Sequence, residues 1–470
     1  MQNFDLIVIG SGPAGEKAAV KAAYFNYRVA IIEKNERLGG AAVNTGTIPS
    51  KALRETALYL SGKHEKDLYN IQKVLCEKAS IEHFLYRKNQ VIDSESKAIL
   101  QNISQHNVSL FRGIGSFIDE HTIRIVTKDG SEKIIQGKNI IIATGSTPYH
   151  PSKIPFDTTR IHDSDSILNI RYFPKSICIV GAGVTGCEYS TIFSTMGSKV
   201  FLVNKYDVTL PFLDQEIAEA LITQMKKDGV QILFNDDIAS VKKPNNIHEP
   251  LNILLKSNKP LLTDMFLFTV GRKGNVDDLC LEKINVQTNS RKQILVDEKY
   301  RTHLSHIYAV GDVIGFPSLA STSQDQGRIA VSHIIQSKDL DHIAKILPFA
   351  IYTVPEVSTV GLSEEKAQKE KINYCIGKAH YCDMPRGKIM GLKKGFLKII
   401  FDRDSLIILG VHIIGTIASE LIHYGLSLVQ EKKTLMNVIS SVFNYPTLHD
   451  LYKYACYDAL SNLTGHKVKT

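Results

Sequence analysis

The sequence predicts an α/β protein in which two copies of a βαβ unit precede a C-terminal α+β domain. A G-x-G-x-x-G fingerprint follows an apolar strand at residues 4–15, and the same pattern recurs at 176–189. After residue 345 the pattern changes to short alternating strands followed by helices. Fingerprints placed between a strand and a helix are typical of Rossmann-like dinucleotide-binding domains. We therefore expect two such domains and a third domain without a nucleotide site.

The first fingerprint, FDLIVIGSGPAG, supplies Gly10, Gly12 and Gly15. In this motif the first glycine makes the turn, the second admits a pyrophosphate and the third lets helix and strand pack closely. The helix N-terminus then offers free N–H groups to the phosphates. The next strand, YRVAIIE, ends on Glu33. A carboxylate there accepts both ribose hydroxyls and repels a 2′-phosphate, which predicts FAD as the ligand.

The second fingerprint, SICIVGAGVTGCEY, supplies Gly181, Gly183 and Gly186, and its second strand, SKVFLVN, ends on Asn204. Asn204 lacks the negative charge of Glu33, and the adjacent Lys205 can attract a phosphate. This site is therefore expected to accept both NAD(H) and NADP(H). Alternatively, Asn204 is a neutral strand end and Lys205 points to solvent.

The remaining segments suggest where the domains divide. A lysine-rich helical stretch covers about 50–100, and a hairpin turns at Lys128-Asp129-Gly130 between GSFIDEHTIRIVT and SEKIIQ. Buried strands follow in NIIIATGS, MFLFTVGR and HIYAVGD, and helices are expected at about 416–431 and 446–461. We predict an FAD-binding domain from 1–150 and 273–345, an NAD(P)-binding domain at 151–272 and an interface domain at 346–470.

Composition narrows the function classes. The net charge of +8 is spread along the chain without a polybasic block, which argues against a nucleic-acid partner. The longest apolar run is too short for a bilayer, so no membrane association is expected. Seven scattered cysteines without a C-x-x-C pair argue against disulfides and against a metal site. Together with the lack of an export signal, this favours the cytoplasm.

A chain-long set of motifs carries a family resemblance. GSGPAG, a G-G…I-P-S-K frame at 39–51, ATG at 143–145, GAGVTGCE, VGR at 270–272, AVGD at 309–312 and NYPT occur in that order. The ordered set resembles the class I pyridine nucleotide–disulfide oxidoreductase family. RIHDSDSIL, FLDQE and IYTVPEVSTVG resemble its members that transfer hydride reversibly between NADP(H) and NAD(H). The resemblance implies an FAD enzyme that is at least a homodimer through its C-terminal domain.

The resemblance also implies roles for individual residues. Lys51 resembles the lysine beside the flavin N5, Glu188 its carboxylate partner near the nicotinamide, and Tyr445 a residue that reaches the partner subunit's flavin site. The expected FAD contacts beyond the first fingerprint and Glu33 are Lys34, Gly40, Gly115, Thr144, Gly145, Asp312 and Ala320. Gly271 and Arg272 are expected at the NAD(P) site.

Two departures decide which chemistry remains. The family's disulfide reductases carry cysteines where this chain has Ala42 and Thr47, and a histidine base where it has Tyr445. Thiol exchange needs those groups, whereas hydride transfer through a flavin does not. His449, three residues after Pro446, is expected to be a solvated helix histidine. The sequence thus predicts ping-pong hydride transfer between nicotinamides without a redox-active disulfide.

Two other functions stay open at this point. An NAD(P)H diaphorase or oxidase of the same fold would pass electrons to quinones or oxygen. A non-catalytic flavoprotein would bind dinucleotides without turnover; the missing cysteines suggest it, but both fingerprints, Lys51 and Glu188 count against it.

Overall fold

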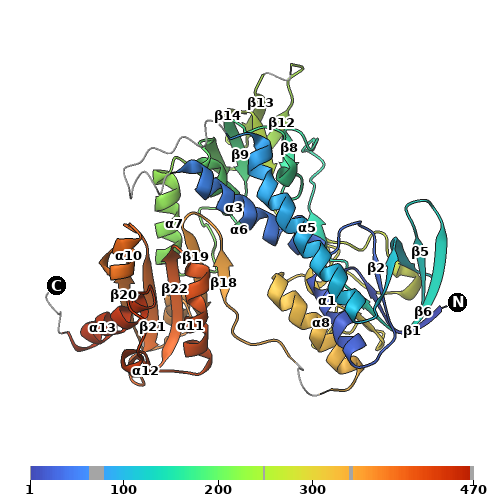
Figure 1. Ribbon diagram of the computed structural model, residues 1–470. Coiled ribbons are helices and arrows are strands. Elements are labelled where there is room, and N and C mark those ends of the chain that lie inside the picture. The colour runs from blue at the N-terminus through green and yellow to red at the C-terminus, as the bar shows by residue number, and fades with distance from the viewer. Residues whose placement is uncertain (1, 63–78, 247–248, 338–341, 466–470) are drawn as a thin grey trace. The chain divides into compact units, whose positions relative to one another are not determined.

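The computed structural model describes residues 2–62, 79–246, 249–337 and 342–465, which form two compact units (Figure 1). Unit 1 comprises Met1–Leu53, Ile81–Arg171 and Val270–Ile343. Unit 2 comprises Arg54–Ser80, Tyr172–Thr269 and Ala344–Thr470. The predicted four-segment division into domains stays a prediction.

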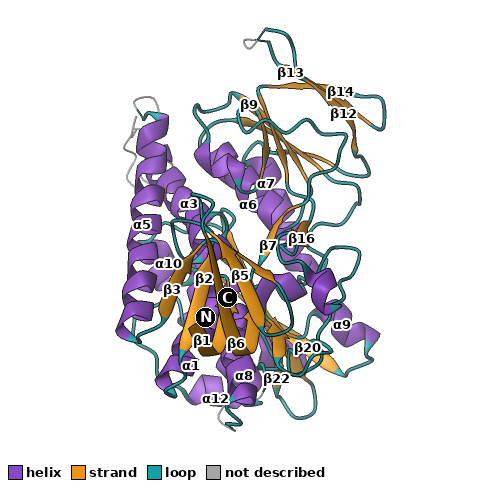
Figure 2. Cartoon of the chain, turned by 90° about the vertical axis from the view of Figure 1, so that its right-hand side faces the viewer, coloured by secondary structure: helices purple, strands orange, loops and turns teal. Residues whose placement is uncertain are grey.

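Unit 1 is built on a sheet whose central strands are parallel (Figure 2). Their order across the sheet is β3 (Ser109–Arg112), β2 (Val29–Glu33), β1 (Gln2–Ile9), β6 (Glu132–Ile142) and β17 (Ile307–Ala309). The antiparallel strands β5 (Thr122–Val126) and β4 (Ile114–Phe117) continue from the first half of β6. The first predicted βαβ unit is thus confirmed as β1, α1 (Pro13–Tyr24) and β2.

Both faces of this sheet are buried, which explains the unbroken apolar runs in its strands. Leu6 and Val8 of β1 belong to a core shared with α1 and α8 (Ala320–Ile334), which lie side by side (Figure 1). Ile7 and Ile9 belong to a second core on the opposite face. Successive side chains of β1 point to opposite faces of the sheet, so alternate residues pack into the two cores. This alternation fixes the register of β1.

Strand β6 differs from the prediction in its length. The sequence predicted a hairpin strand followed by a separate buried strand, but the structure joins them into one strand of 11 residues. The turn at 128–130 is confirmed. Gly137 does not interrupt the strand; it is needed there because a Cβ would lie 2.9 Å from Ile7 of the neighbouring strand.

Unit 2 contains the second βαβ unit, formed by β9 (Ser176–Val180), α6 (Val184–Thr195) and β10 (Lys199–Val203). Strands β11 (Gln231–Leu233) and β15 (Met265–Phe268) extend its parallel sheet in the order β11, β10, β9, β15. Helix α7 (Gln215–Lys227) connects β10 to β11. The repeat seen in the sequence is therefore a repeat of structure.

The C-terminal part of unit 2 is a five-stranded antiparallel sheet. Its order is β18 (Phe349–Ile351), β19 (Glu356–Gly361), β22 (Ile408–Gly415), β21 (Phe396–Asp402) and β20 (Tyr374–His380). The two predicted helices are confirmed as α11 (Ala418–Gln430) and α13 (Asp450–Thr464). They share one core, and the Tyr452 hydroxyl donates to the Leu421 carbonyl at 2.7 Å. Prediction missed α12 (Leu435–Ser440) between them.

The other described elements are short or peripheral, apart from the long α5: α2 (Gly40–Asn44), α3 (Thr47–Ser61), α5 (Ile81–Gln105), β7 (Ser146–Pro148), β8 (Ile161–Asp163), η1 (Ser166–Asn169), β12 (Ile238–Lys242), β13 (Leu251–Leu255), β14 (Pro260–Thr263), β16 (Arg272–Gly274), η2 (Leu281–Ile284), η3 (Gly311–Ile314), α9 (Glu364–Lys369), η4 (Tyr381–Asp383) and α10 (Pro385–Ile389). Among the described residues, no helix has the length and apolar character needed to cross a membrane.

A buried ion cluster lies on the sheet face opposite α11 and α13. Leu397 and Ile399 of β21 enter the helix-side core, so Lys398 between them points the other way. Its ammonium contacts both carboxylate oxygens of Asp214 at 3.0 Å and Glu364 at 2.6 Å, and the Lys398 and Asp214 side chains are 1% and 0% exposed.

Burial alone would lower the pKa of Lys398, but the hydrogen bond to Glu364 and the charge of Asp214 outweigh it and raise that pKa. Burial would raise the pKa of Asp214, yet neighbouring cationic groups lower it. The contribution of Lys398 to stability is therefore present below its ordinary pKa of 10.5. The contribution of Asp214 is present above its ordinary 3.8 and is lost as the pH falls through the lowered value.

The variant Lys398→Met is expected to lower the free energy of unfolding by about 3–5 kcal/mol at neutral pH, because Asp214 stays buried without its cation. The loss should shrink towards pH 4, since protonation relieves the unpaired carboxylate. Urea midpoints at pH 7.5 and 4.5 measure both effects. The control, Lys378→Met, removes a partly exposed lysine paired with Glu216 at 2.6 Å and should cost about 1 kcal/mol or less. Equal losses in the two variants would contradict the role of burial.

Candidate dinucleotide sites

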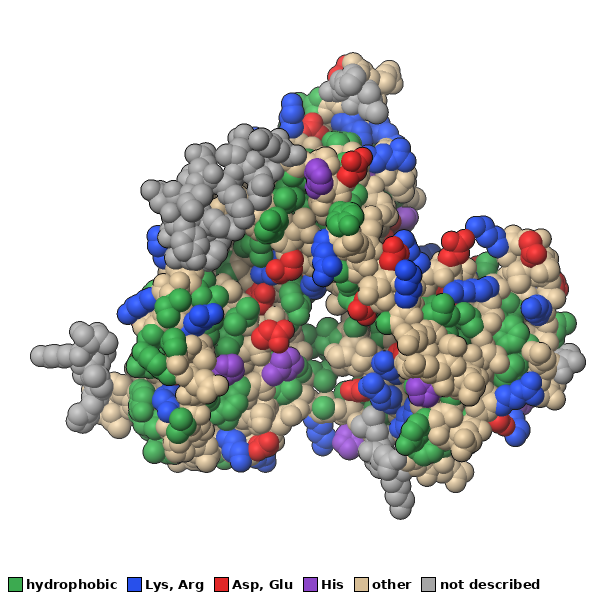
Figure 3. Space-filling view, viewed as in Figure 1, with side chains coloured by type: hydrophobic (Ala, Val, Ile, Leu, Met, Phe, Trp, Pro, Cys, Tyr) green, Lys and Arg blue, Asp and Glu red, His purple; other side chains and the backbone are tan. Residues whose placement is uncertain are grey.

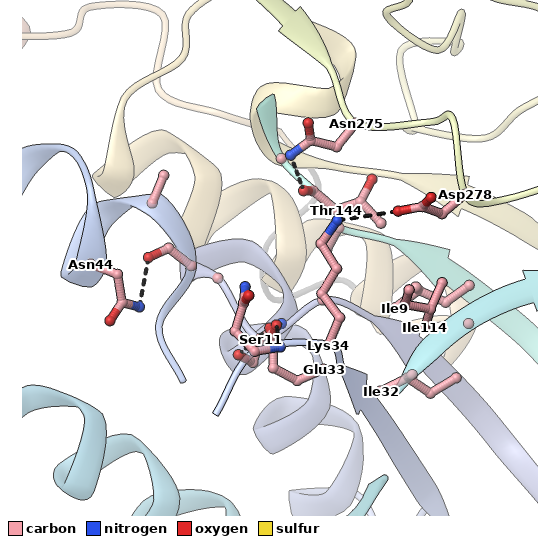
Figure 4. Close-up of a pocket in the computed structure, with 18 of the residues that line it drawn as sticks. Ile9, Ser11, Ile32, Glu33, Lys34, Asn44, Ile114, Thr144, Asn275 and Asp278 are labelled. Carbon is pink, nitrogen blue, oxygen red and sulfur yellow. Dashed lines mark hydrogen bonds and ion pairs between the residues drawn. The ribbon is translucent and has the colours of Figure 1, made fainter. Parts of the chain in front are cut away.

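A cavity of about 640 Å³ opens at the carboxyl ends of β1, β2 and β6, entirely within unit 1 (Figure 4). Its walls come from 9–12, 32–37, 40–41, 44–45, 113–115 and 143–147, with Asp165, Asn275, Asp278 and Leu279. Ligands of parallel α/β sheets bind at this edge. The volume lies in the range of small-molecule and cofactor sites.

Two glycines of the first fingerprint are required by the protein's own packing. Gly10 has φ +107°, and a Cβ there would lie 2.3 Å from the Ala143 carbonyl oxygen. A Cβ on Gly15 would lie 1.9 Å from the carbonyl oxygen of Gly10. Gly15 therefore allows the first turn of α1 to rest on the end of β1.

Gly12 differs, because the protein leaves its side-chain position open. Its φ of −65° suits any residue, and the nearest atom to a Cβ would be the Gly40 Cα at 3.8 Å. Gly40 in turn needs to be small, since its own Cβ would meet Gly12 at 2.7 Å. The free space beside the N-terminus of α1 matches the close approach of a phosphate group.

Glu33 is fixed at the floor of this cavity (Figure 4). One carboxylate oxygen accepts from the Ser11 N–H at 3.0 Å and the Ser11 hydroxyl at 2.6 Å, and the other accepts from the Asn35 N–H at 2.8 Å. Each carboxylate oxygen can accept two bonds, so capacity remains for a ribose hydroxyl. Glu33 is 5% exposed, which makes its orientation well defined.

Two polar atoms in the cavity wall have hydrogen-bonding capacity that a bound ligand could use. Thr144 Oγ1 and Asn44 Oδ1 are buried and have no hydrogen-bond partner within the described part of the chain. Asn275 Nδ2 donates to the Thr144 carbonyl at 3.0 Å and so holds this segment in place (Figure 4). Buried polar groups are normally hydrogen-bonded. These orphaned atoms, the space at Gly12 and the Glu33 acceptor together fit a bound dinucleotide such as FAD.

The other expected FAD residues occupy several positions in unit 1. Gly145, with φ +71°, and Gly115 of β4 line the cavity. Lys34 also lines it and contacts Asp278 at 3.2 Å (Figure 4). Ala320 is the first residue of α8, which places its N–H among the unpaired donors of that helix.

Asp312 and Arg272 meet through Ser146. The Ser146 hydroxyl donates to Asp312 at 3.1 Å and accepts from Arg272 Nε at 2.9 Å. Arg272 also contacts Asp165 at 3.1 Å. Burial raises the pKa of Asp165, although the Arg272 charge opposes the shift. Arg272, expected at the NAD(P) site, thus lies in unit 1 and supports the cavity wall.

Lys51 and the two former cysteine positions lie on two helices that follow each other in the chain. Ala42 is in α2, and Thr47 begins α3, which also carries Lys51. The Lys51 ammonium lies 3.4 Å from the Ser50 hydroxyl. Lys51 belongs to unit 1 and Glu188 to unit 2, so their predicted pairing stays a prediction.

The second fingerprint repeats the first within unit 2. Gly181 has φ +99°, and a Cβ on Gly186 would lie 1.8 Å from the Gly181 carbonyl oxygen. A Cβ on Gly183 would meet nothing within 4 Å, which leaves the same open space as at Gly12. Glu188 is 4% exposed on α6 and accepts the Tyr352 N–H at 2.9 Å.

Asn204 takes the position of Glu33 but with different bonding. Its carbonyl oxygen accepts the Ala182 N–H at 3.0 Å, and its amide nitrogen donates to the carbonyls of Tyr206 and Val208 at 2.9 and 3.0 Å. Both amide hydrogens are thereby used. The exposed Lys205, 5.4 Å from the centre of the Tyr206 ring, is the cation beside this strand end.

Two C-terminal residues and one glycine complete the expected set. Gly271 has φ +87° and belongs to unit 1. The Tyr445 side chain is 75% exposed, and its contact with a partner subunit stays a prediction. The expectation for His449 was wrong: it is half-buried at the N-cap of α13, 6.0 Å from the Phe443 ring and 6.4 Å from the Tyr424 ring.

Sequence reasoning missed several residues of the first cavity: Ser11, Asn44, Ser146, Asp165 and Asn275. Ser11 occupies a variable position of the fingerprint, and the motifs that contain or adjoin Asn44, Ser146 and Asp165 did not single these residues out. Their roles depend on tertiary placement, so no local signal could have identified them.

Comparisons with known proteins agree with this architecture. The pyridine nucleotide-disulphide oxidoreductase family profile matches residues 4–327, and its dimerisation-domain profile matches 347–456. Proteins named soluble pyridine nucleotide transhydrogenase from Pectobacterium atrosepticum and Mycobacterium bovis are 39% identical over 464 residues, which is 98% of both chains.

Solved structures give the same result at lower identity. LpdA from Mycobacterium tuberculosis superposes with a TM-score of 0.89 at 25% identity, covering 97% of this chain and 99% of that one. The HOCl-induced flavoprotein disulfide reductase RclA from Escherichia coli, solved as a Cu(II) complex, has a TM-score of 0.88 at 25% identity, with the same coverage.

The open positions at Gly12 and Gly183 allow the two sites to be separated experimentally. Gly12→Ala is expected to weaken FAD binding roughly 10- to 100-fold, because overpacking costs about 1–3 kcal/mol. The matched variant Gly183→Ala should keep its FAD and lose affinity for NADPH instead. FAD absorbance after gel filtration and NADPH calorimetry measure the two effects. Loss of FAD from both variants alike would contradict the assignment of separate sites.

Proposed function

Because the chain belongs to the pyridine nucleotide-disulphide oxidoreductase family, we propose that it is an FAD-dependent, soluble NAD(P)+ transhydrogenase. The reaction is NADPH + NAD+ ⇌ NADP+ + NADH. The observation that carries the proposal is the 39% identity over 98% of the chain to proteins of that name, combined with alanine and threonine at the two cysteine positions. The chain lacks the dithiol but keeps the residues of both dinucleotide sites.

FAD, when bound, accepts a hydride from one nicotinamide and returns it to another. The chain's own residues would bind and orient the partners of that exchange. Glu33, Thr144 and the N-terminus of α1 would hold the adenosine and phosphate groups. Lys51 would place positive charge at the flavin, and Glu188 would lie near the nicotinamide, as in the family pattern. Asp312, held by Ser146, would bind the ribityl chain.

The second βαβ unit would accept both nicotinamide nucleotides in turn, which gives ping-pong kinetics. Asn204 brings no negative charge to the strand end, so a 2′-phosphate is not repelled. Its amide hydrogens are already used, however, so attraction would come from Lys205. NADP(H) and NAD(H) would therefore differ by a modest electrostatic contribution at an exposed site.

The same relatives also bear on the assembly of the protein and on its location. The dimerisation-domain match supports a homodimer or a larger homo-oligomer, and Tyr445 would reach the partner subunit's flavin site. Relatives named soluble support a soluble protein, and the scattered cysteines support the cytoplasm. The proposed domains are FAD-binding at 1–150 and 273–345, NAD(P)-binding at 151–272 and interface at 346–470.

The deciding experiment is an anaerobic transhydrogenation assay on the FAD-loaded protein, with NADPH as donor and thio-NAD+ as acceptor. Thio-NADH should form, with parallel double-reciprocal lines when both substrates vary. Lys51→Met should lower kcat roughly 100-fold, since a preorganised charge at a reacting centre contributes about 3 kcal/mol. Lys299→Met, at an exposed lysine, is the control and should leave kcat unchanged.

The same assay separates the alternatives. If NADPH bleaches the flavin absorbance but no thio-NADH forms, while oxygen or a quinone restores the absorbance, the protein is an oxidase or diaphorase. If NADPH leaves the flavin absorbance unchanged, the protein is a non-catalytic flavoprotein. Lipoamide-dependent NADH turnover would instead indicate a disulfide substrate.

Nucleotide selectivity gives a second test. Asn204→Glu should raise the KM for NADPH at least 10-fold and leave the KM for NADH nearly unchanged, because only the 2′-phosphate meets the new charge. Lys205→Met should raise the KM for NADPH about 2- to 5-fold, in line with a single exposed ion pair. If both variants weaken NADH and NADPH equally, the strand end does not select the 2′-phosphate.

A further inference from the structure

A second cavity, of about 360 Å³, lies in unit 1 between α1, α8 and the end of α5. It shares no lining residue with the dinucleotide cavity. Helices α1 and α8 pack against each other along this side of the sheet (Figure 1). The volume is sufficient for a small organic ligand. The transhydrogenase reaction assigns this cavity no role.

The lining side chains give this cavity a basic character. Lys17 and Lys21 of α1, Arg328 of α8 and His106 after α5 line it, and no acidic residue does within the described part of the chain. The space-filling view shows both basic and acidic side chains on the surface of unit 1 (Figure 3). Lys17 and Lys21 are four residues apart, so they project from one face of α1 with Cβ atoms about 5–6 Å apart. Arg328 adds a third cation from a different helix.

Each of these cations contacts another side chain of the protein, and two of them pair with carboxylates. The Lys21 ammonium donates to the Ser332 hydroxyl of α8. Lys17 pairs with Glu16 at 2.8 Å, and Arg328 pairs with Asp325 at 2.7 Å. The Arg328 and Asp325 side chains are 37% and 50% exposed. Such exposed ion pairs contribute about 0–1 kcal/mol to the stability of the fold, so an incoming anion can replace the carboxylate of Asp325.

The remaining lining residues are apolar. Val20 lies between Lys17 and Lys21 on the same helix face, and Tyr24 and Phe25 pack edge to face with ring centres 5.4 Å apart. Their side chains give the cavity an apolar wall beside the cations. The cations come from two helices, so they meet this wall from more than one element. The arrangement suits carboxylates joined by a short aliphatic chain.

We propose that this cavity, defined by Lys17, Lys21 and Arg328 around Val20, is a binding site for a small aliphatic di- or tricarboxylate. The methylene groups lie against Val20, the guanidinium of Arg328 binds one carboxylate through two parallel hydrogen bonds, and the lysines bind the others. Because α1 begins at the dinucleotide cavity, a ligand that contacts both α1 and α8 and holds them together also stabilises that cavity. The ligand therefore slows the loss of FAD. This second effect rests on the proposed function, but the binding does not.

Calorimetry with citrate on the full-length, FAD-loaded protein at low ionic strength tests the binding. Citrate should bind at one site per chain, more tightly than glutarate, and at least 10-fold more tightly than acetate or inorganic phosphate. Lys21→Gln/Arg328→Gln should weaken citrate at least 10-fold, and Arg328→Lys should weaken it less. The control, Lys128→Gln/Lys299→Gln, removes the same net charge at exposed positions elsewhere and should bind citrate normally.

Three outcomes overturn the proposal: phosphate or acetate binding as tightly as citrate, equal weakening in the control double variant, and no citrate binding at millimolar concentration. Retained FAD and an unchanged melting temperature without citrate verify that the variants are folded. Citrate should also lengthen the half-time of FAD release at least twofold, and only in proteins that bind it. If citrate binds but NADPH yields no thio-NADH, the proposed function fails and the carboxylate site stands.

Discussion

The contact between the third and the first glycine of each fingerprint is the constraint on which both nucleotide sites depend. In each unit a Cβ on the third glycine would lie less than 2 Å from the carbonyl oxygen of the first, at 1.9 Å for Gly15 and 1.8 Å for Gly186. Only a bare α-carbon allows helix and strand to meet so closely. That meeting directs the free N–H groups of the helix toward the space beside Gly12 and Gly183, which the protein leaves open. Anion binding is thus a consequence of backbone packing before any side chain contributes.

On this common frame, one side chain makes the two sites different. In unit 1 the Ser11 N–H donates to a carboxylate, and in unit 2 the Ala182 N–H donates to an amide oxygen at the matching position. Unit 2 therefore keeps the hydrogen bond that orders the turn but lacks the negative charge of Glu33. Glu33 can still accept a hydrogen bond on its cavity side, whereas both amide hydrogens of Asn204 are donated to carbonyls of its own loop. A retained cofactor benefits from strong directional acceptors. A site that exchanges two nucleotides benefits from a weaker and less selective strand end.

Local patterns predicted what depends on local physics. The two fingerprints, the strands around them, the Asp-Gly hairpin and the C-terminal helices could all be derived because glycine geometry and hydrophobic period act within about 30 residues. Long-range relations could not. Arg272 was expected with the second nucleotide; its hydrogen bonds go to Ser146 and Asp165 in unit 1, and its contact with NAD(P) stays a prediction. His449 was expected in water and packs among aromatic rings. No sequence pattern singled out Lys398, because its three carboxylate partners come from α7, α9 and the residue before α7.

The loss of both cysteines is best understood from where their positions lie. Ala42 and Thr47 belong to separate helical segments joined through Gly46, and neither supports the cavity wall through a side-chain hydrogen bond that the structure records among its described residues. Gly40 and Asn44, one on each side of Ala42, do shape the wall through close packing and an amide. Replacing the thiols therefore removes one route for electrons without disturbing the nucleotide pocket. A flavin without a neighbouring dithiol can exchange hydride only with molecules that reach it from solution. Among the residues described, the nicotinamide nucleotide site is the only other site that this chain provides for such a molecule. The absence of the thiols thus removes disulfide exchange and leaves the flavin chemistry on which the proposed exchange between nucleotides depends.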